Sequence, residues 1–205
     1  MKNAVCLSIV MAWAAILASC SNLLAPQPDP SRFYLLSPAS GPAAAGAHAD
    51  GLAIGLGPIL FPAYLKRPEV VARVDHNRVE LSKVDRWAAP LDTTFARVLA
   101  DDLANELSID QVITYPWWNT VKIDYQVQVE VDRFNSVSGR TVETSARWSI
   151  SDGKSGKLLY SATSDLSEPF NQDNTEASVE ALSKTVDALA ARIAQAIRQL
   201  QEQRS

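Results

Sequence analysis

The chain has 205 residues and a formal net charge of -4, with 19 lysines and arginines against 23 aspartates and glutamates. This length suits a single domain of ordinary size. A mildly acidic chain without a run of basic residues is a poor candidate for binding nucleic acid, and it has no polybasic segment to attract an anionic membrane.

The N-terminal segment predicts a bacterial lipoprotein. Lys2 precedes an apolar run over residues 4–18, and the run ends in Leu17-Ala18-Ser19-Cys20, which has the form of a lipobox. Because a bilayer span needs about 20 apolar residues, we expect residues 1–19 to be a signal peptide instead. Cleavage would leave Cys20 at the N-terminus, lipidated on its sulfur and acylated on its amino group. The alternative is an ordinary secretory signal, in which Cys20 is only a small residue near the cleavage site.

Lipidation predicts where the mature protein works. Several acyl chains anchor a protein stably, whereas one chain holds it only marginally. Ser21 stands where an aspartate commonly retains lipoproteins in the inner membrane, so we expect an anchor on the periplasmic side of the outer membrane. Cys6 would leave with the signal peptide, so the mature chain would have no thiol for a disulfide or a metal.

Residues 20–31 comprise the lipidated cysteine and a proline-rich tether. Alternate prolines at Pro26, Pro28 and Pro30 favour an extended polyproline II chain of about 3.1 Å per residue. Residues 32–205 are expected to form one domain. Within that domain, residues 37–50 are rich in Ser, Pro, Ala and Gly without periodicity, which predicts a mobile loop.

The domain begins with strand signals. Short apolar patterns predict strands over residues 32–36 and 52–56, and the second strand is expected to end in a turn at Gly57-Pro58. Residues 70–74 and 78–81 flank a polar turn and predict a hairpin.

A helix and a meander are predicted next. Residues 91–107 carry apolar side chains at helical spacing, and the preceding Pro90 suits a first helical turn. Apolar and polar residues alternate over residues 121–131, 142–150 and 158–162, with short turns between them. This alternation predicts three antiparallel strands with one buried face.

A long helix is predicted over residues 175–201, opened by Asp173 and Glu176 at a capping-box-like spacing. Its apolar stripe also suits a coiled-coil seam, but a sheet with one apolar face needs a covering layer, so we favour packing within the chain. The predicted fold class is α+β: a two-layer sandwich in which two helices cover a mostly antiparallel sheet.

The sequence has no recognisable catalytic constellation. Its two histidines, His48 and His76, have no motif around them, and no nucleophile elbow, zinc-binding helix or phosphate loop occurs. Asp101 and Asp102 are adjacent, and neighbours on a helix point about 100° apart, so both are expected on a solvated face. We therefore predict no catalytic residue, no bound metal and no cofactor.

Two aromatic segments are candidate contact sites for a partner protein or a lipid: Phe61, Tyr64 and Leu65 in a loop, and Trp117 and Trp118 at a strand entrance. If strand periodicity holds, one of the two tryptophans must face outward. The alternative is that these side chains plug the ends of the core. Exposed apolar patches usually mark interfaces, so both interpretations stay open.

Several segments together resemble one family. They are Tyr34-Leu35-Leu36, Leu56-Gly57-Pro58, residues 64–71, residues 77–81, residues 85–91 and residues 95–99. This set resembles the PqiC-type (YmbA) ABC-transport auxiliary lipoproteins over essentially the whole mature chain. The most specific residues are Arg67, Pro68, Glu69, Arg86, Trp87 and Pro90, to which we assign structural rather than catalytic roles because prolines set turns and these charges can pair.

The resemblance implies a non-enzymatic accessory of an Mce-type lipid transport system. By analogy, the protein would dock a periplasmic Mce-domain protein from the outer membrane and support envelope integrity, and a homo-oligomeric ring would suit a ring-shaped partner. Two other functions remain open. One is an assembly lipoprotein of another envelope machine, such as lipopolysaccharide delivery or a secretion channel. The other is a periplasmic hydrolase with dispersed carboxylates, which would need a polar cleft.

Overall fold

The computed structural model describes residues 29–39, 51–110, 112–118, 121–137, 141–171 and 174–203. The chain divides into two compact units, Met1–Pro30 and Ser31–Ser205. The predicted signal peptide, Cys20 and nearly all of the predicted tether lie outside the described residues. All described helices and strands belong to the second unit.

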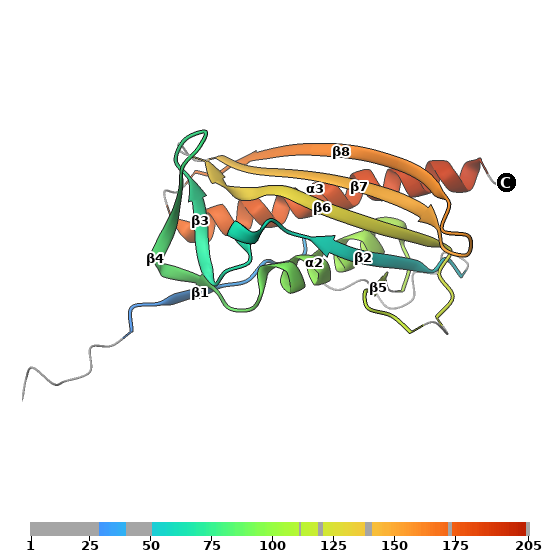
Figure 1. Cartoon of the computed structure of the whole chain (residues 1–205), viewed down its shortest axis with the longest axis horizontal. Helices are drawn as coiled ribbons and strands as arrows, with labels where there is room; N and C mark the ends of the chain where they lie inside the picture. Colours follow the sequence, from blue (N-terminus) through green and yellow to red (C-terminus); the bar gives the residue numbers. More distant parts are fainter. Residues whose placement is uncertain are drawn as a thin grey trace, which may run out of the picture. The chain divides into compact units, whose positions relative to one another are not determined.

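The elements of this unit are labelled in Figure 1. In chain order they are β1 (Arg32–Tyr34), β2 (Ile54–Leu60), the 3-10 turn η2 (Ala63–Leu65), β3 (Glu69–Arg73), β4 (Val79–Trp87), α2 (Leu91–Leu107), β5 (Val112–Thr114), β6 (Tyr125–Val137), β7 (Thr141–Asp152), β8 (Leu158–Pro169) and α3 (Thr175–Glu202).

The eight-stranded sheet that the described residues form is built around β6. One edge of β6 pairs in parallel with β2 through residues 125–130 and with β3 through residues 136–137. Its other edge pairs antiparallel with β7, and β7 pairs antiparallel with β8. β5 continues the sheet beyond β2, while β4 and then β1 continue it beyond β3. The sheet is therefore open, with β1, β5 and β8 as outer strands.

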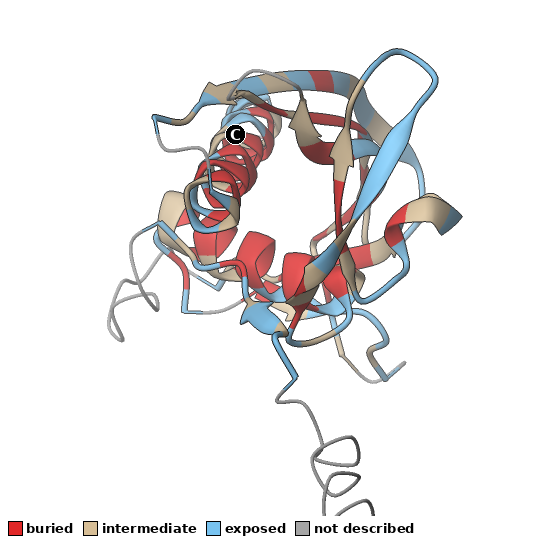
Figure 2. Cartoon of the chain, turned by 90° about the vertical axis from the view of Figure 1, so that its left-hand side faces the viewer, coloured by how far each residue is buried: buried red, intermediate tan, exposed pale blue. Residues whose placement is uncertain are grey.

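Both helices cover one face of this sheet, and the buried side chains lie between the two layers (Figure 2). The helices pack against each other; α2 also packs against β2 and β5, and α3 packs against β6, β7 and β8. The α3 stripe is buried from Val179 to Ala196, and Leu200 packs at its edge. The apolar stripe therefore packs within the chain, the interpretation favoured over a coiled-coil seam.

The predicted α+β fold with two covering helices is confirmed, and so is the antiparallel meander of β6, β7 and β8. The sequence did not predict the parallel pairings, in which β1 joins β4, β5 joins β2, and both β2 and β3 join β6. Those pairings depend on residues far apart in sequence, so no local pattern indicates them.

Several predicted boundaries are wrong. β4 continues to Trp87 and β8 to Pro169, beyond their predicted ends at residues 81 and 162. β2 does not end at Gly57-Pro58: it continues to Leu60, because pairing with β6 resumes at Ile59 after a register shift. β6 begins at Tyr125 rather than at residue 121, because its ladders with β2 and β7 both start at Tyr125. The N-cap of α3 is Asn174, whose side chain accepts a hydrogen bond from the Ala177 amide at 2.8 Å, so the expected cap was placed one residue too early.

The first residues of the predicted mobile loop are hydrogen-bonded to the helices. The Ser37 amide donates to Ser183 Oγ at 3.2 Å, and the Ala39 amide donates to Asp102 Oδ1 at 3.0 Å. Leu36 between β1 and these contacts is buried. Residues 40–50 of that loop lie outside the described residues.

Candidate functional site

Two exposed aromatic side chains, one of them the most exposed among the described residues, belong to the segment that follows β5. Tyr115 is 57% exposed and Trp118 is 83% exposed. The Tyr115 amide donates to the Leu56 carbonyl at 2.9 Å, which holds the start of this segment against β2. A Cβ at Gly57 would lie 2.6 Å from Tyr115 Cβ, and Gly57 has a φ of +126°, so only glycine fits beneath this tyrosine.

Trp117 packs against the sheet, unlike its neighbour. Its ring meets Tyr115 edge to face at a centroid distance of 5.4 Å, and a Cβ at Gly55 would lie 3.1 Å from the Trp117 ring. Of the two interpretations of this pair, packing therefore describes Trp117. Trp118 faces outward, and its contact with a partner stays a prediction.

A hollow of about 670 Å³ opens beside Tyr115, between α2 and strands β2 and β5. α2 contributes small side chains to this hollow, and carboxylates also line it. Its lining includes Ala96, Ala100, Ala104, Asp92, Asp101 and Asp110. Tyr115, Trp118 and this hollow are called the aromatic surface below.

The other predicted contact segment is packed inward. Phe61 is buried and meets Phe95 and Phe134 edge to face, at centroid distances of 5.2 and 6.3 Å. Leu65 is also buried. Tyr64 packs against the core, with its hydroxyl 3.4 Å from Asn135 Oδ1. As the chain is folded here, Phe61 and Leu65 cannot contact a partner, because core rings and helices cover them.

The six signature residues gather where β3 begins and β4 ends. Arg67 and Arg86 both pair with Glu69, at 3.2 and 3.4 Å. The amide of the buried Trp87 donates to the Pro68 carbonyl at 2.7 Å, and Pro90 is the N-cap residue of α2. The segments 66–68 and 87–92 enclose a hollow of about 380 Å³.

Asp85 lies next to this cluster and joins three elements. It is buried, and its carboxylate accepts hydrogen bonds from Arg32 on β1 at 2.8 Å, Ser82 on β4 at 3.0 Å and Thr175 on α3 at 2.7 Å. Burial raises the pKa of this carboxyl, but the three hydrogen bonds outweigh burial and hold its pKa below the ordinary value. Arg67 and Arg86 pair with Glu69 rather than with Asp85.

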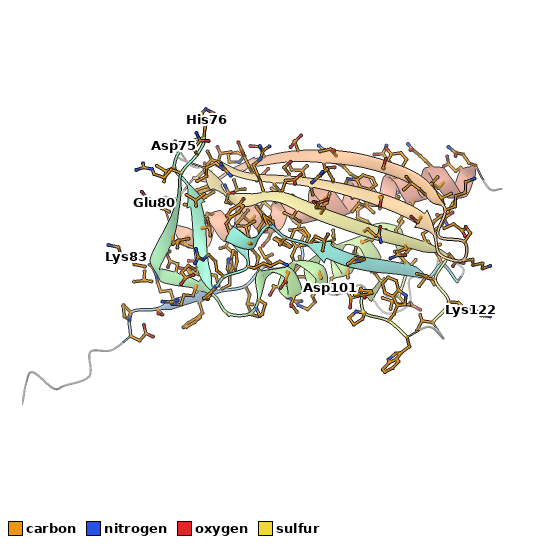
Figure 3. All side chains as sticks on the ribbon, viewed as in Figure 1. Asp75, His76, Glu80, Lys83, Asp101 and Lys122 are labelled. Carbon is orange, nitrogen blue, oxygen red and sulfur yellow. The ribbon has the colours of Figure 1, made fainter. Side chains whose placement is uncertain are left out.

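The prediction that Asp101 and Asp102 share a solvated helix face is wrong for Asp102. Asp101 is partly exposed and pairs with Arg97 at 3.3 Å (Figure 3). Asp102 is 1% exposed; its Oδ1 accepts from Ala39, and its Oδ2 has no hydrogen-bond partner among the described residues. Burial, opposed by the Ala39 hydrogen bond and reinforced by nearby Asp187, raises the pKa of Asp102 to about 6.

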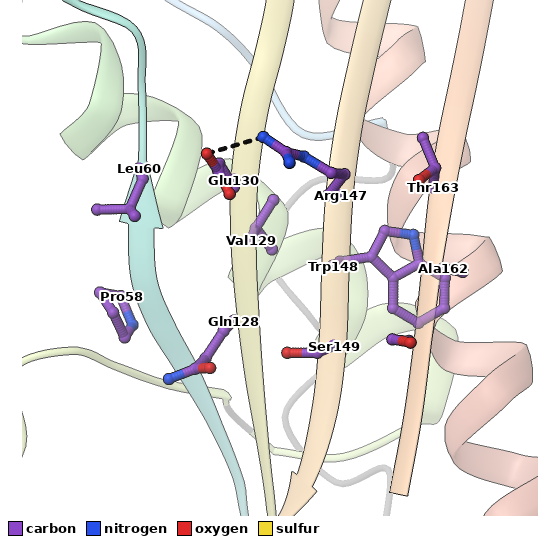
Figure 4. A pocket seen from close by; sticks show the side chains of 11 residues that line it. Pro58, Leu60, Gln128, Val129, Glu130, Arg147, Trp148, Ser149, Ala162 and Thr163 are labelled. Atoms are coloured by element: carbon purple, nitrogen blue, oxygen red, sulfur yellow. Dashed lines mark ion pairs between the residues drawn. The ribbon is translucent and has the colours of Figure 1, made fainter. Parts of the chain in front are cut away.

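The outer face of the meander is polar and internally paired. A hollow of about 600 Å³ crosses β2, β6, β7 and β8, and Arg147, which lines it, pairs with Glu130 at 2.9 Å (Figure 4). Arg147 also pairs with Asp132 at 3.0 Å. Among the described residues no group of three or more His, Cys, Asp or Glu side chains could hold a metal ion. No described helix is long and apolar enough to cross a membrane.

Comparison with known proteins decides the family. A sequence model of the ABC-type transport auxiliary lipoprotein component matches residues 34–194. The chain belongs to this family. The PqiC-type resemblance of the signature residues is thereby confirmed, and the match spans both the signature cluster and the aromatic surface.

Solved structures share the fold of this auxiliary lipoprotein. A crystal structure of an uncharacterized protein has 18% identity and a TM-score of 0.68, covering 82% of this chain and 98% of that one. A DUF330 protein from Xanthomonas campestris has 12% identity and a TM-score of 0.66, covering 85% of this chain and 100% of that one. At such identities the likeness concerns the fold alone. No curated protein matches the chain.

The family comprises transport auxiliary lipoproteins and is not known for enzymatic activity. A lipid anchor is in keeping with this membership. Cys20 itself lies outside both the matched residues and the described residues, so its lipidation stays a prediction.

Proposed function

We propose that this auxiliary lipoprotein is a non-enzymatic docking component of an Mce-type lipid transport system. The observation that carries the proposal is the family match over residues 34–194, which associates the chain with ABC transport. The Mce-domain partner is our further step and rests on the PqiC-type signature at residues 67–69 and 86–90.

In this proposal the protein acts by position. Acyl chains on Cys20 hold it on the periplasmic side of the outer membrane, and the proline tether lets the folded unit reach roughly 30 Å from the anchor. There it receives the end of a transport assembly that crosses the periplasm and helps keep the envelope intact. The sequence requires no cofactor for this role.

We propose the aromatic surface as the docking site. Trp118 is almost fully exposed, whereas Trp87 and Trp148 are buried. Large exposed aromatic side chains are the residues that most often anchor protein interfaces. The neighbouring hollow between α2 and β2–β5 offers a place for a partner side chain or segment.

A homo-oligomeric ring would suit a ring-shaped partner. β8 pairs only with β7 within the described part of the chain, which leaves twelve residues of strand with one edge open to pairing. The mass of the detergent-solubilised lipoprotein, measured by light scattering, tests this part of the proposal; a monomer at micromolar concentration would contradict it.

Affinity purification from intact envelopes tests the function. A tagged, lipidated chain should recover an Mce-domain protein, and Trp118→Ser should reduce that recovery by about tenfold, as expected for an interface anchor. Leu60→Ser is the matched control, because Leu60 is also an exposed apolar side chain but lies at the end of β2, outside the aromatic surface. Recovery of lipopolysaccharide-delivery or secretion components, without an Mce-domain protein, would overturn the assignment.

The anchor has a test of its own. Cys20→Ser removes the sulfur that would carry the lipid, so the variant should leave the outer-membrane fraction after a salt wash while the wild type stays. A variant that remains bound after washing would show that lipidation of Cys20 does not hold the protein there.

A further inference from the structure

Charge is distributed unevenly along the chain. Residues 31–90 contain seven lysines and arginines and five aspartates and glutamates, a net charge of +2. Residues 91–205 contain eleven lysines and arginines and seventeen aspartates and glutamates, a net charge of -6. An acidic protein thus has one basic region, although no basic run is visible in its sequence.

The fold gathers much of this basic region at one end. β1, β3 and β4 lie together at the left of Figure 1, and Lys83 on β4 projects from that end in Figure 3. The strands are joined in register, because Phe33 pairs with Arg86 and Arg86 pairs with Glu69. Residues that are up to 53 positions apart in sequence therefore share one surface.

Apolar side chains are exposed on the same strands. Phe33 is 62% exposed and Leu35 is 50% exposed, whereas Tyr34 packs against the core and Leu36 is buried. This alternation shows that Phe33 and Leu35 point away from the core on one side of the segment. Val79 and Leu81 on β4 are exposed as well.

The cations here differ in how they are paired. Lys66 and Lys83 are exposed, and neither makes an ion pair within the described residues. Arg67 and Arg86 share the single carboxylate of Glu69. Asp85 is buried and bound by Arg32, so it projects little negative charge from this end. Exposed carboxylates do accompany the cations: Glu80 lies on β4 with Lys83, and Glu176 lines the hollow that Phe33 and Leu35 also line. The basic end is defined as Phe33, Leu35, Lys66, Arg67, Val79, Leu81, Lys83 and Arg86.

We propose that the basic end binds the surface of a bilayer containing anionic phospholipids. Lysines and arginines near such a surface are attracted to its headgroups, and aromatic and aliphatic side chains partition into the boundary between headgroups and acyl chains. The exposed groups of the basic end match both parts of that surface. A protein partner for the basic end would have to offer both negative charge and apolar surface. The short chain between this end and the predicted anchor at Cys20 favours the bilayer instead.

The connection is short. The folded unit begins at Ser31, eleven residues after Cys20, and β1 follows at once. Eleven extended residues span at most about 40 Å, so an anchored chain keeps Ser31, next to β1 of the basic end, within that reach of the membrane. A weak affinity of the basic end for lipid headgroups then suffices for binding, because tethering makes the contact intramolecular. The inference rests on the anchor proposed above, but on no transport partner.

Vesicle binding without the lipid tests the inference. The mature chain from residue 20 with Cys20→Ser contains all described core residues, and it is floated with vesicles of phosphatidylglycerol and phosphatidylethanolamine or with pure phosphatidylcholine. We expect at least tenfold stronger binding to the anionic vesicles, weakened by 0.5 M salt through screening. Equal binding to both vesicles, or binding to neither, would overturn the proposal without affecting the transport assignment.

Paired variants locate the contact. Lys66→Gln with Lys83→Gln should weaken binding by roughly 30-fold, because each cation contributes about a fivefold effect near an anionic surface. Lys154→Gln with Lys157→Gln makes the same change in net charge at the β7–β8 turn and should leave binding unchanged. Equal losses in the two pairs would show attraction by overall charge and contradict a specific surface.

The apolar contribution is tested in the same way. Phe33→Ser with Leu35→Ser should reduce binding about tenfold, whereas Leu158→Ser with Tyr160→Ser, another exposed apolar pair, should not. Unchanged thermal unfolding of each variant shows that the fold is kept. If only the lysine pair mattered, with no effect of the apolar pair, insertion of Phe33 and Leu35 would be wrong.

Discussion

Two buried carboxylates fasten the first residues of the folded unit, and their surroundings are opposite. Asp85 accepts hydrogen bonds from three side chains, and these hold its pKa below the ordinary value. Asp102 accepts only the Ala39 amide at one oxygen, and its pKa is raised to about 6. Burial alone therefore does not decide the charge of a carboxyl; the number of donors around it does.

This difference in hydrogen bonding gives the first residues of the folded unit one stable attachment, at Asp85, and one labile attachment, at Asp102. Near Asp85, strand β1 is joined to β4 and to the start of α3 by charged hydrogen bonds. Near Asp102, residues 37–39 cross α2 and α3 with one hydrogen bond to each helix. We infer that β1 stays attached when the segment after it loosens. If the chain is anchored at Cys20, force from the anchor would reach the Asp85 attachment first.

The largest effect is expected from Asp85→Ala. This change leaves Thr175, Ser82 and Arg32 without their common acceptor, and loss of charge-assisted hydrogen bonds at a buried site should lower the free energy of unfolding by about 3 kcal/mol. Urea unfolding measures this loss of stability. Asp75→Ala is the control, because Asp75 is exposed and contacts only groups of its own turn, the exposed Arg78 and the exposed Asn77 amide, among the described residues, so its loss should stay below about 1 kcal/mol.

The pH dependence of the free energy of unfolding tests the role of Asp85 more sharply. Since the folded-state pKa of Asp85 is lowered, its stabilisation is fully present above the unfolded-state pKa of about 3.9 and is lost as pH falls through the folded-state pKa. The difference between wild type and Asp85→Ala should therefore shrink below pH 4. A difference that grows in acid would contradict the hydrogen-bonded carboxylate.

The pH dependence of stability should have the opposite sign for Asp102. Its folded state binds a proton more tightly than the unfolded state, so its contribution to stability falls as pH rises from about 4 to 6 and stays low above that. Asp102→Asn keeps an acceptor for Ala39 without the buried charge. At pH 7.5 this variant should be more stable than wild type by about 3 kcal/mol at most, and the two should converge near pH 4.

Asp101→Asn is the matched control for this titration. Asp101 is the adjacent residue on α2, partly exposed and paired with Arg97. Its charge adds less to the raised pKa of Asp102 than burial and Asp187 do, so its substitution should change the pH dependence of unfolding far less than Asp102→Asn does. Equal stabilities of wild type and Asp102→Asn at every pH between 4 and 7.5 would show that Asp102 is not a buried carboxylate in solution.

The sequence predicted the elements whose signals are local. The bounds of α2 match because the apolar spacing over residues 91–107 and the preceding Pro90 lie within the helix and at its start. The meander was equally visible, because each strand alternates by itself. The predicted starts of β6 and the α3 cap were wrong, because neighbouring strands and the side chain of Asn174 set those boundaries.

Whether each candidate site residue is exposed or buried depended on tertiary contacts. Phe61 belongs to the core because Phe95 and Phe134 close over it, and neither is near it in sequence. Asp102 is buried because residues 37–39 cross α2, which a helical pattern cannot show. Trp117 and Trp118 are identical neighbours, and only the contacts of Trp117 with Tyr115 and Gly55 tell them apart. Local chemistry therefore identified the candidate residues, while the tertiary contacts decided which of them are available.

The smallest expected effect tests the weaker attachment directly. Ser183 Oγ donates to the Val179 carbonyl within α3 and also accepts the Ser37 amide. Ser178 Oγ donates to the Thr175 carbonyl of the same helix, and both serines are buried. Ser183→Ala should therefore lower the free energy of unfolding by about 0.5–1 kcal/mol more than Ser178→Ala, since it alone leaves the Ser37 amide without its acceptor.

Hydrogen exchange gives this last prediction a local measurement. The Ser37 amide should exchange faster in Ser183→Ala than in Ser178→Ala, while the backbone amides of β1 and β4 keep their protection because Asp85 still joins those strands. If β1 lost protection together with Ser37, residues 31–39 would open as one unit, and the contrast between a stable and a labile attachment would fail. Loss confined to Ser37 and Ala39 would place the weak point of the segment at the helices.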